Sequence, residues 1–232
     1  MSQLFDISEV SIRNDLKQLE KQNLLVRERG GALKIRSNHF GITPSISDKQ
    51  KEFMKAKQNI AQCAVKYINE GDSIILDSGT TTTEIAKNLG HFNNLTIITN
   101  ALNIASMLSK YNGINIFLPG GILRKNSLSL IGTLADESFE KFYCDVLFLD
   151  AERFDTTHGL SASSAEEAHL NKIMIKIAKK VIVVTDSSKF ERRRFAFIGP
   201  LVDVDMVITD SDIKEEDRKR LEKNGVEVVV VG

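Results

Sequence analysis

A run of small and hydroxyl-bearing residues lies between a predicted strand and a predicted helix of this sequence. It follows the apolar segment 73–76 and consists of Asp77, Ser78, Gly79, Thr80, Thr81 and Thr82. A helix N-terminus offers unpaired backbone N–H groups and the positive end of a dipole, and a glycine lets a ligand approach the backbone closely. We therefore predict that this run binds a phosphate group. The alternative interpretation is a helix N-cap that is rich in hydroxyls.

Further strand ends could converge on the same site. Asn100 follows the next predicted strand, Gly120 and Gly121 follow the one after it, and Lys189 follows a later one. Ligands of open α/β sheets bind beyond the carboxyl ends of the strands, where Lys189 could neutralise a phosphate. Taken singly, each residue has an ordinary role as a helix N-cap, a turn or a solvated lysine. Together they predict one ligand site.

Residues 150–169 gather several acids with His158 and His169, two of the four histidines. Carboxylates beside a histidine are what an isomerase or deaminase would need to move protons on a sugar phosphate. Spacing along a loop does not place such groups within reach of one another. We interpret them as solvated acids and predict no catalytic residue.

The segment nearest the N-terminus could carry out a second kind of chemistry, the recognition of DNA. Ser8 is typical of a helix N-cap, and the spacing of Ile12, Leu16 and Leu19 predicts a helix over residues 8–21 with one apolar side. The side chains outside that apolar side are those of Ser11, Arg13, Asn14 and Lys17. Arginine and asparagine suit base edges, whereas serine and lysine suit phosphates, so this helix could enter a major groove.

A short hairpin is predicted after this helix. Segments 24–27 and 32–35 flank a turn that contains two glycines. Arg27 and Arg29 would lie on this wing, where they could contact the DNA backbone or minor groove. A plain charged surface explains these residues equally well, because residues 1–36 carry seven Lys/Arg against five Asp/Glu and the whole chain has no net charge.

The elements that position these residues are predicted to form two domains. Residues 1–36 form a partial DNA-binding domain, 37–47 a turn-rich linker, and 48–232 a larger domain. In the larger domain a long amphipathic helix from Asp48 precedes apolar strands that alternate with helices, which predicts an α/β fold with a mostly parallel sheet. The apolar side of that first helix is predicted to consist of Phe53, Ile60, Ala64, Tyr67 and Ile68.

Composition narrows the class of protein further. No apolar run approaches the roughly 20 residues that span a bilayer, and the first residues lack the features of a secretory signal. We therefore expect a cytoplasmic protein with no membrane contact. Cys63 and Cys144 have no Cys or His at metal-ligand spacing, so we expect neither a disulfide nor a metal site, and no cofactor is predicted.

Four segments resemble the DeoR family of bacterial transcription repressors. They are Ser-Glu-Val-Ser-Ile-Arg-Asn-Asp-Leu (8–16), Arg-Gly-Gly-Ala (29–32), Leu-Asp-Ser-Gly-Thr-Thr-Thr (76–82) and Asp-Ser-Ser-Lys-Phe (186–190). The resemblance covers essentially the whole chain and is greatest to regulators of amino-sugar and related hexose operons. It implies a winged helix-turn-helix followed by a sensor domain with the fold of ribose-5-phosphate isomerase, glucosamine-6-phosphate deaminase and coenzyme A transferases. It also implies that the sensor binds a phosphorylated sugar without turning it over.

The sequence departs from the family's pattern in two places. The family's DNA-binding domain begins with a further helix, so we expect residues 1–36 to form only part of a winged helix-turn-helix. Asp150-Ala151-Glu152-Arg153 stands where the family usually has a turn similar to Gly-Val-Asp-Gly. We expect this second departure to place longer charged side chains near the pocket and to alter the identity of the ligand.

Three functions remain open at this point. The first is a repressor of a carbohydrate-catabolism operon, whose partners are operator DNA, a phosphorylated sugar and other copies of the chain in a dimer or tetramer. The second is a phosphosugar isomerase or deaminase, which fold analogy supports but which leaves the DNA-binding segments unexplained. The third is a sensor module that has lost DNA binding and forms mixed oligomers with a longer relative.

Overall fold

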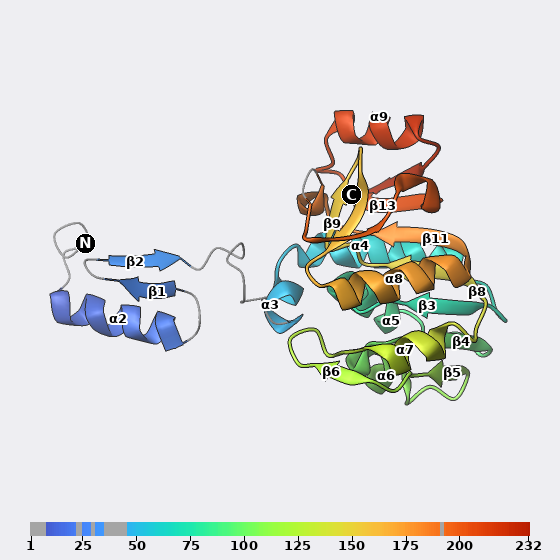
Figure 1. Cartoon of the computed structure of the whole chain (residues 1–232), viewed down its shortest axis with the longest axis horizontal. Coiled ribbons are helices and arrows are strands. Elements are labelled where there is room, and N and C mark those ends of the chain that lie inside the picture. The colour runs from blue at the N-terminus through green and yellow to red at the C-terminus, as the bar shows by residue number, and fades with distance from the viewer. Residues whose placement is uncertain (1–7, 22–24, 29–30, 35–45, 191–192) are drawn as a thin grey trace. The chain divides into compact units, whose positions relative to one another are not determined.

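The computed structural model of the chain (Figure 1) describes residues 8–21, 25–28, 31–34, 46–190 and 193–232. Contacts within the chain divide it into two compact units, Met1–Pro44 and Ser45–Gly232. The predicted linker, residues 37–47, lies mostly outside the described residues, so the predicted domain bounds stay a prediction.

The first unit contains one helix and a hairpin. Helix α2 spans Glu9–Lys21, and strands β1 (Leu25–Glu28) and β2 (Gly31–Lys34) pair in antiparallel fashion. The hydroxyl of Ser8 accepts a hydrogen bond of 3.1 Å from the backbone N–H of Ser11, which satisfies one of the donors left open at a helix start. The predicted N-cap, helix and wing are therefore confirmed.

The second unit is built on a parallel sheet, because its strands are the near-continuous apolar runs that such sheets bury on both faces. Within its described residues seven strands pair in parallel, in the order β14-β13-β11-β8-β3-β4-β5. Their bounds are β3 Ser73–Leu76, β4 Leu95–Ile98, β5 Ile114–Phe117, β8 Cys144–Leu149, β11 Ala178–Val184, β13 Met206–Asp210 and β14 Glu227–Val231. The predicted α/β fold with a mostly parallel sheet is confirmed.

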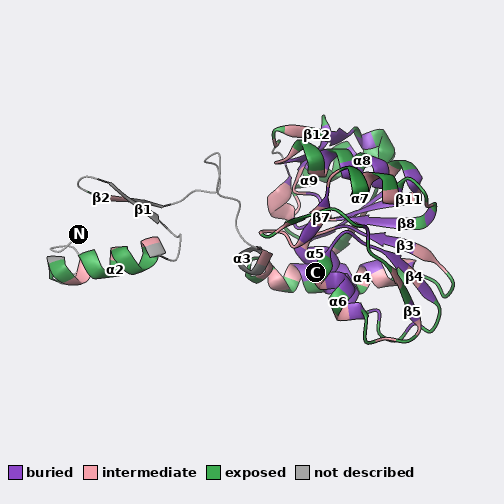
Figure 2. Cartoon of the chain, turned by 60° about the horizontal axis from the view of Figure 1, so that its bottom comes forward, coloured by how far each residue is buried: buried purple, intermediate pink, exposed green. Residues whose placement is uncertain are grey.

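Helices cover both faces of this sheet, and Figure 2 shows the central strands as buried. Side chains that alternate along β8 enter two different cores: Phe148 packs on one face, and Leu147 and Leu149 pack on the other. The first core receives side chains of α4 (Met54–Ala64), α5 (Thr80–Lys87) and α6 (Leu102–Leu108). The second core receives side chains of α7 (Thr133–Phe139), α8 (Ala165–Ile177) and α9 (Glu215–Lys223).

The predicted long helix from Asp48 is wrong in one respect, because the structure breaks it in two. Helix α3 spans Ile46–Lys51, and Phe53 then takes a left-handed backbone conformation with φ 54° before α4 begins. Phe53 is 49% exposed and does not share the buried face of α4. The short helix η1 (Val65–Tyr67) follows α4, so the predicted apolar side holds only in part: Ile60, Ala64 and Ile68 are buried.

Smaller antiparallel elements lie beside the main sheet. A hairpin joins β6 (Ile122–Arg124) to β7 (Ser129–Ile131). A three-stranded sheet has the order β12-β10-β9, with β9 Arg153–Asp155, β10 Gly159–Ala162 and β12 Ala196–Gly199. The short helices η2 (Ser187–Lys189) and η3 (Leu201–Asp203) follow β11 and β12. Among the described residues, no helix has the length and apolar character needed to cross a membrane.

Candidate functional site

The predicted phosphate-binding run forms the N-terminus of α5. Gly79 has an extended backbone and immediately precedes the helix, and Thr80, Thr81 and Thr82 are buried. The Thr82 hydroxyl donates a hydrogen bond of 2.6 Å to the backbone carbonyl of Asp77, so in this structure it holds the loop in place. The position at a strand end and a helix start is as predicted, whereas contact with a ligand stays a prediction.

A carboxylate already lies at this helix N-terminus. Asp150 follows β8, the neighbour of β3 in the sheet, and its Oδ2 accepts a hydrogen bond of 2.9 Å from the backbone N–H of Thr81. A Cβ atom placed on Gly79 would lie 2.1 Å from that oxygen. The glycine therefore leaves the space that the Asp150 carboxylate fills.

Charged side chains gather around this contact. Lys57, Lys189 and Asp186 lie close enough for their charges to act on Asp150. Burial raises the pKa of Asp150, whereas the hydrogen bond from the Thr81 N–H and the positive charges of the two lysines act to lower it. Burial also raises the pKa of Asp77 well above its ordinary value, and it lowers the pKa of Lys57, which is 2% exposed. The cluster thus combines the carboxyl groups of Asp77, Asp150 and Asp186 with the ammonium groups of Lys57 and Lys189; Asp77, Asp186 and Lys57 are buried, and Asp150 and Lys189 are half-buried.

Two buried oxygens near these strand ends have no hydrogen-bond partner among the described residues. They are Oδ1 of Asn100 and Oδ2 of Asp186, and both residues are 1% exposed. Buried polar atoms are nearly always paired with protein or water, so each of these two oxygens can accept a hydrogen bond from a ligand or a water molecule. Sugar hydroxyls are donors of this kind.

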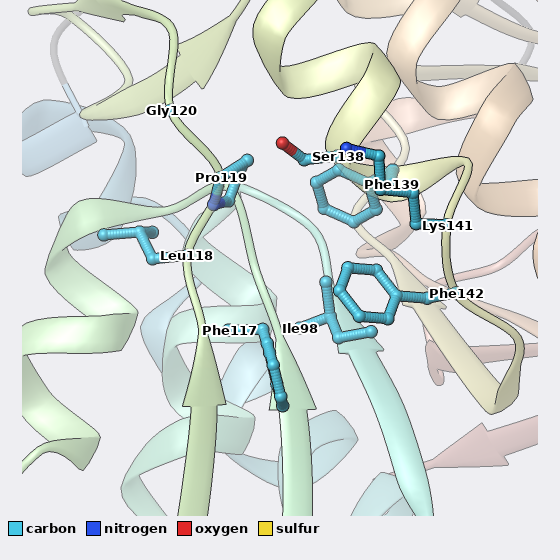
Figure 3. Close-up of a pocket in the computed structure, with 9 residues that line it drawn as sticks. All are labelled: Ile98, Phe117, Leu118, Pro119, Gly120, Ser138, Phe139, Lys141 and Phe142. Carbon is cyan, nitrogen blue, oxygen red and sulfur yellow. The ribbon is translucent and has the colours of Figure 1, made fainter.

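The structure does not bring all the predicted strand ends together. Asn100 pairs with the β6–β7 hairpin, where its backbone carbonyl accepts a hydrogen bond of 2.8 Å from Leu130. Gly121 has φ 134° and lies against the backbone of Ile131. Gly120 instead lines a cavity of about 200 Å³, together with Phe117 of β5 and Phe139 of α7 (Figure 3). Lys189, by contrast, lies near the α5 N-terminus through its interaction with Asp150.

The acids and histidines of residues 150–169 have structural partners. Glu152 accepts hydrogen bonds from the backbone and hydroxyl of Ser163, at 2.8 and 2.6 Å. Glu167 forms an ion pair with Arg124, and His158 lies 3.0 Å from Asp155. The interpretation of these acids as solvated is therefore wrong for Glu152, Asp155 and Glu167, which are half-buried and paired with neighbouring groups.

In the first unit, the predicted DNA-contacting side chains of α2 lie at its surface. Arg13, Asn14 and Lys17 are exposed, and Lys17 follows Arg13 by four residues and Asn14 by three, so it adjoins both of them on one side of the helix. Ser11 is half-buried, with its hydroxyl 2.9 Å from that of Ser8. Arg27 belongs to β1, and Arg29 lies outside the described residues.

Family models match both parts of the chain. The DeoR C-terminal sensor domain matches residues 52–211, and the DeoR-like helix-turn-helix domain matches residues 1–38. The chain belongs to the DeoR family. The predicted resemblance is thereby confirmed, together with the succession of a DNA-binding segment and a sensor domain.

Relatives of this DeoR-family chain match it along nearly its whole length. The putative aga operon transcriptional repressor of Escherichia coli O157:H7 is 40% identical over 232 residues, which are 100% of this chain and 86% of the relative. The transcriptional repressor GlcR of Bacillus subtilis is 34% identical over 98% of this chain and 86% of its own length. Among solved structures, ribose 5-phosphate isomerase A of Neisseria gonorrhoeae has a TM-score of 0.43 and 16% identity, over 59% of this chain and 53% of its own.

Sequence reasoning did not assign Lys57 or Asp186 to the site of this DeoR-family chain. A signal for Lys57 was available, because it occupies the apolar face of α4 with Ile60, Ala61 and Ala64, at a spacing of three, four and seven residues. A lysine on a buried helix face needs a polar partner nearby. Asp186 follows a buried strand, as Asp77 and Asp150 do, and that repeated placement was the available signal.

Proposed function

We propose that this chain represses a carbohydrate-utilisation operon, and that a phosphorylated sugar bound beside the N-terminus of α5 controls its binding to operator DNA. The observation that carries the proposal is the match of one chain to both a DeoR-like helix-turn-helix and a DeoR sensor domain. The names of the two relatives, a repressor of the aga operon and the repressor GlcR, support the same conclusion.

The ligand acts as an effector and not as a substrate in this proposal. Proton transfer on a sugar phosphate needs an acid or base that is free to come within hydrogen-bond reach of the reacting group. Glu152 and Glu167 of the acidic segment are engaged with Ser163 and Arg124 instead. A phosphosugar that binds one conformation of the sensor more tightly shifts the population of DNA-competent molecules, which needs no turnover.

The proposed partners are operator DNA and further copies of the chain. Operator DNA is bound by the exposed side of α2, where Arg13 and Asn14 contact bases and Lys17 contacts a phosphate. Bacterial operators are commonly two-fold symmetric, so the chain acts as a dimer or a tetramer. No interface between copies is assigned.

Substitution of two α2 residues tests the DNA-binding part of the proposal. Full-length protein is used to select binding sequences from a random DNA pool, and affinities are then measured by fluorescence anisotropy. We expect Arg13→Ala to weaken specific binding by about 10- to 100-fold because a base contact is lost. Lys17→Ala should weaken binding to all sequences and lower the slope of log affinity against log salt by about 1.

A lysine of the sensor domain supplies the control. Lys223→Ala removes one positive charge from the exposed end of α9, and we expect its DNA affinity to stay within about twofold of the wild type. Recovery of no binding sequence, or equal affinities for all three variants, would contradict the assignment of α2 and favour a sensor module without DNA binding.

A further inference from the structure

The Asp150 carboxylate occupies the place where an anionic ligand would meet helix α5. Strands β8 and β3 are parallel neighbours, with Phe148 opposite Leu76, and the backbone N–H of Asp77 donates to the carbonyl of Phe148. This register sets Asp150 beside the start of α5, where its Oδ2 lies 2.9 Å from the backbone nitrogen of Thr81. A carboxylate at a helix N-terminus gains from the same N–H groups and the same dipole that attract a phosphate.

The loop is shaped around this carboxylate. A Cβ on Gly79 would lie 2.1 Å from Oδ2 and 2.4 Å from Cγ of Asp150, so no other residue at position 79 leaves room for the carboxylate. The hydroxyls of Thr82 and Thr83 bond to carbonyl groups of the loop itself, at 2.6 and 2.5 Å. The backbone N–H of Thr81 is therefore already hydrogen-bonded to Asp150, and the hydroxyls of Thr82 and Thr83 stabilise the loop.

Acidic and basic side chains surround the Asp150 carboxylate. Asp77 and Asp186, which are 3% and 1% exposed, lie near Asp150 together with Lys57 and Lys189. Oδ2 of Asp186 is buried without a hydrogen-bond partner among the described residues, so the cluster contains an acceptor that still lacks a donor. Because the Asp150 carboxylate already accepts the hydrogen bond of the Thr81 N–H, an added phosphate can reach that donor only if this carboxylate moves away.

We propose that Asp150 is a built-in competitor for the anion-binding position, so that an oxyanion ligand binds at α5 only by displacing the Asp150 carboxylate from the Thr81 N–H. The inference rests on the proposed function, because it assigns the effector's phosphate to the same helix N-terminus. Asp150 thereby lowers the affinity of this chain for phosphorylated ligands and favours those whose remaining groups donate a hydrogen bond to Asp186.

Removal of the carboxylate tests this inference with inorganic phosphate as the probe. We expect Asp150→Ala to bind phosphate at least tenfold more tightly than the wild-type full chain does, by calorimetric titration at constant ionic strength. Asp150→Asn keeps an oxygen that can accept from Thr81 but loses the charge, so its gain should be smaller. The Asn variant also serves if the Ala variant does not fold, as judged by circular dichroism.

The opposite end of the same strand provides a matched control. Asp145 accepts hydrogen bonds of 2.9 Å from both the backbone N–H and the hydroxyl of Ser73, so Asp145→Ala makes the same change of charge at the other edge of the sheet. Its phosphate affinity should equal that of the wild type. A tenfold gain in Asp145→Ala as well would show a general effect of net charge and overturn the inference.

The outcomes separate this inference from the proposed function. Equal phosphate binding by the wild type and both Asp150 variants overturns the inference and leaves the phosphorylated effector in place. Binding by the Asp150 variants alone supports the inference and counts against a phosphorylated effector for the wild type. Binding by no variant overturns the inference, while the proposed function is tested separately by the effect of sugar phosphates on DNA binding.

Discussion

Gly159→Ala is expected to lower the free energy of unfolding by about 3 kcal/mol, the largest loss that we predict for a single methyl group in this chain. Gly159 begins β10 with φ 94°, and an added Cβ would lie 2.2 Å from the carbonyl oxygen of Gly199 and 2.9 Å from Cα of Pro200. Both contacts are to backbone atoms of the adjoining strand and loop, so a side-chain rotation cannot relieve them. Urea unfolding followed by circular dichroism measures the loss.

Gly225→Ala separates the two causes of this destabilisation, which are the left-handed backbone and the clash of the added Cβ. Gly225 follows the C-terminus of α9 with φ 84°, but an added Cβ would meet nothing within 4 Å. Only the cost of a left-handed backbone applies there, which is about 1 kcal/mol. Equal losses for the two variants would mean that β10 and β12 are not packed as closely as the structure has them.

Lys57→Met is expected to destabilise the protein by about 3 kcal/mol at pH 7.5, because it removes a buried cation and leaves its carboxylate neighbours behind. Lys57 is 2% exposed, its Nζ donates a hydrogen bond of 2.7 Å to the carbonyl of Glu52, and its charge acts with those of Asp150 and Asp186. Burial raises the pKa of Asp150, so this carboxylate becomes neutral as pH falls through its raised pKa. The loss should therefore shrink in acid, as urea unfolding at several pH values would show.

Lys55→Met is the control for this substitution. Lys55 lies on the exposed side of the same helix, so its replacement should change the free energy of unfolding by less than about 0.5 kcal/mol at any of these pH values. If Lys57→Met lowered the free energy of unfolding no more than Lys55→Met does, the proposed balance of charges at the strand ends would be wrong.

The strands of the main sheet and its mostly parallel character could be predicted because local signals in the sequence mark each strand. Runs such as Val181–Val184 in β11 and Met206–Ile208 in β13 are apolar without interruption, and only strands buried on both faces have such a pattern. Strands β6, β9 and β10 were not predicted, since segments of three or four residues acquire their pairing from distant partners. The break at Phe53 was missed because no glycine or proline marks the left-handed residue there.

The site could be predicted only in outline. Residues 77–82 and Lys189 were identified because each follows a buried strand, and the carboxyl ends of parallel strands share one edge of the sheet. Gly120 was grouped with them by the same reasoning, although the structure places it in the separate cavity of Figure 3. Asp150 was identified as a departure, but its hydrogen bond to Thr81 depends on the register between β8 and β3, which the sequence does not specify.

The most direct test of the proposed function is the effect of sugar phosphates on DNA binding by the full chain. A panel of sugar phosphates and their unphosphorylated parents is added to the complex with selected DNA, with fluorescence anisotropy as the readout. We predict that at least one sugar phosphate changes the DNA dissociation constant about tenfold or more, a coupling of about 1.4 kcal/mol, while its parent sugar has no effect and no product forms. An unchanged DNA affinity with every phosphorylated sugar would contradict control by a phosphosugar, and formation of product would identify an enzyme instead.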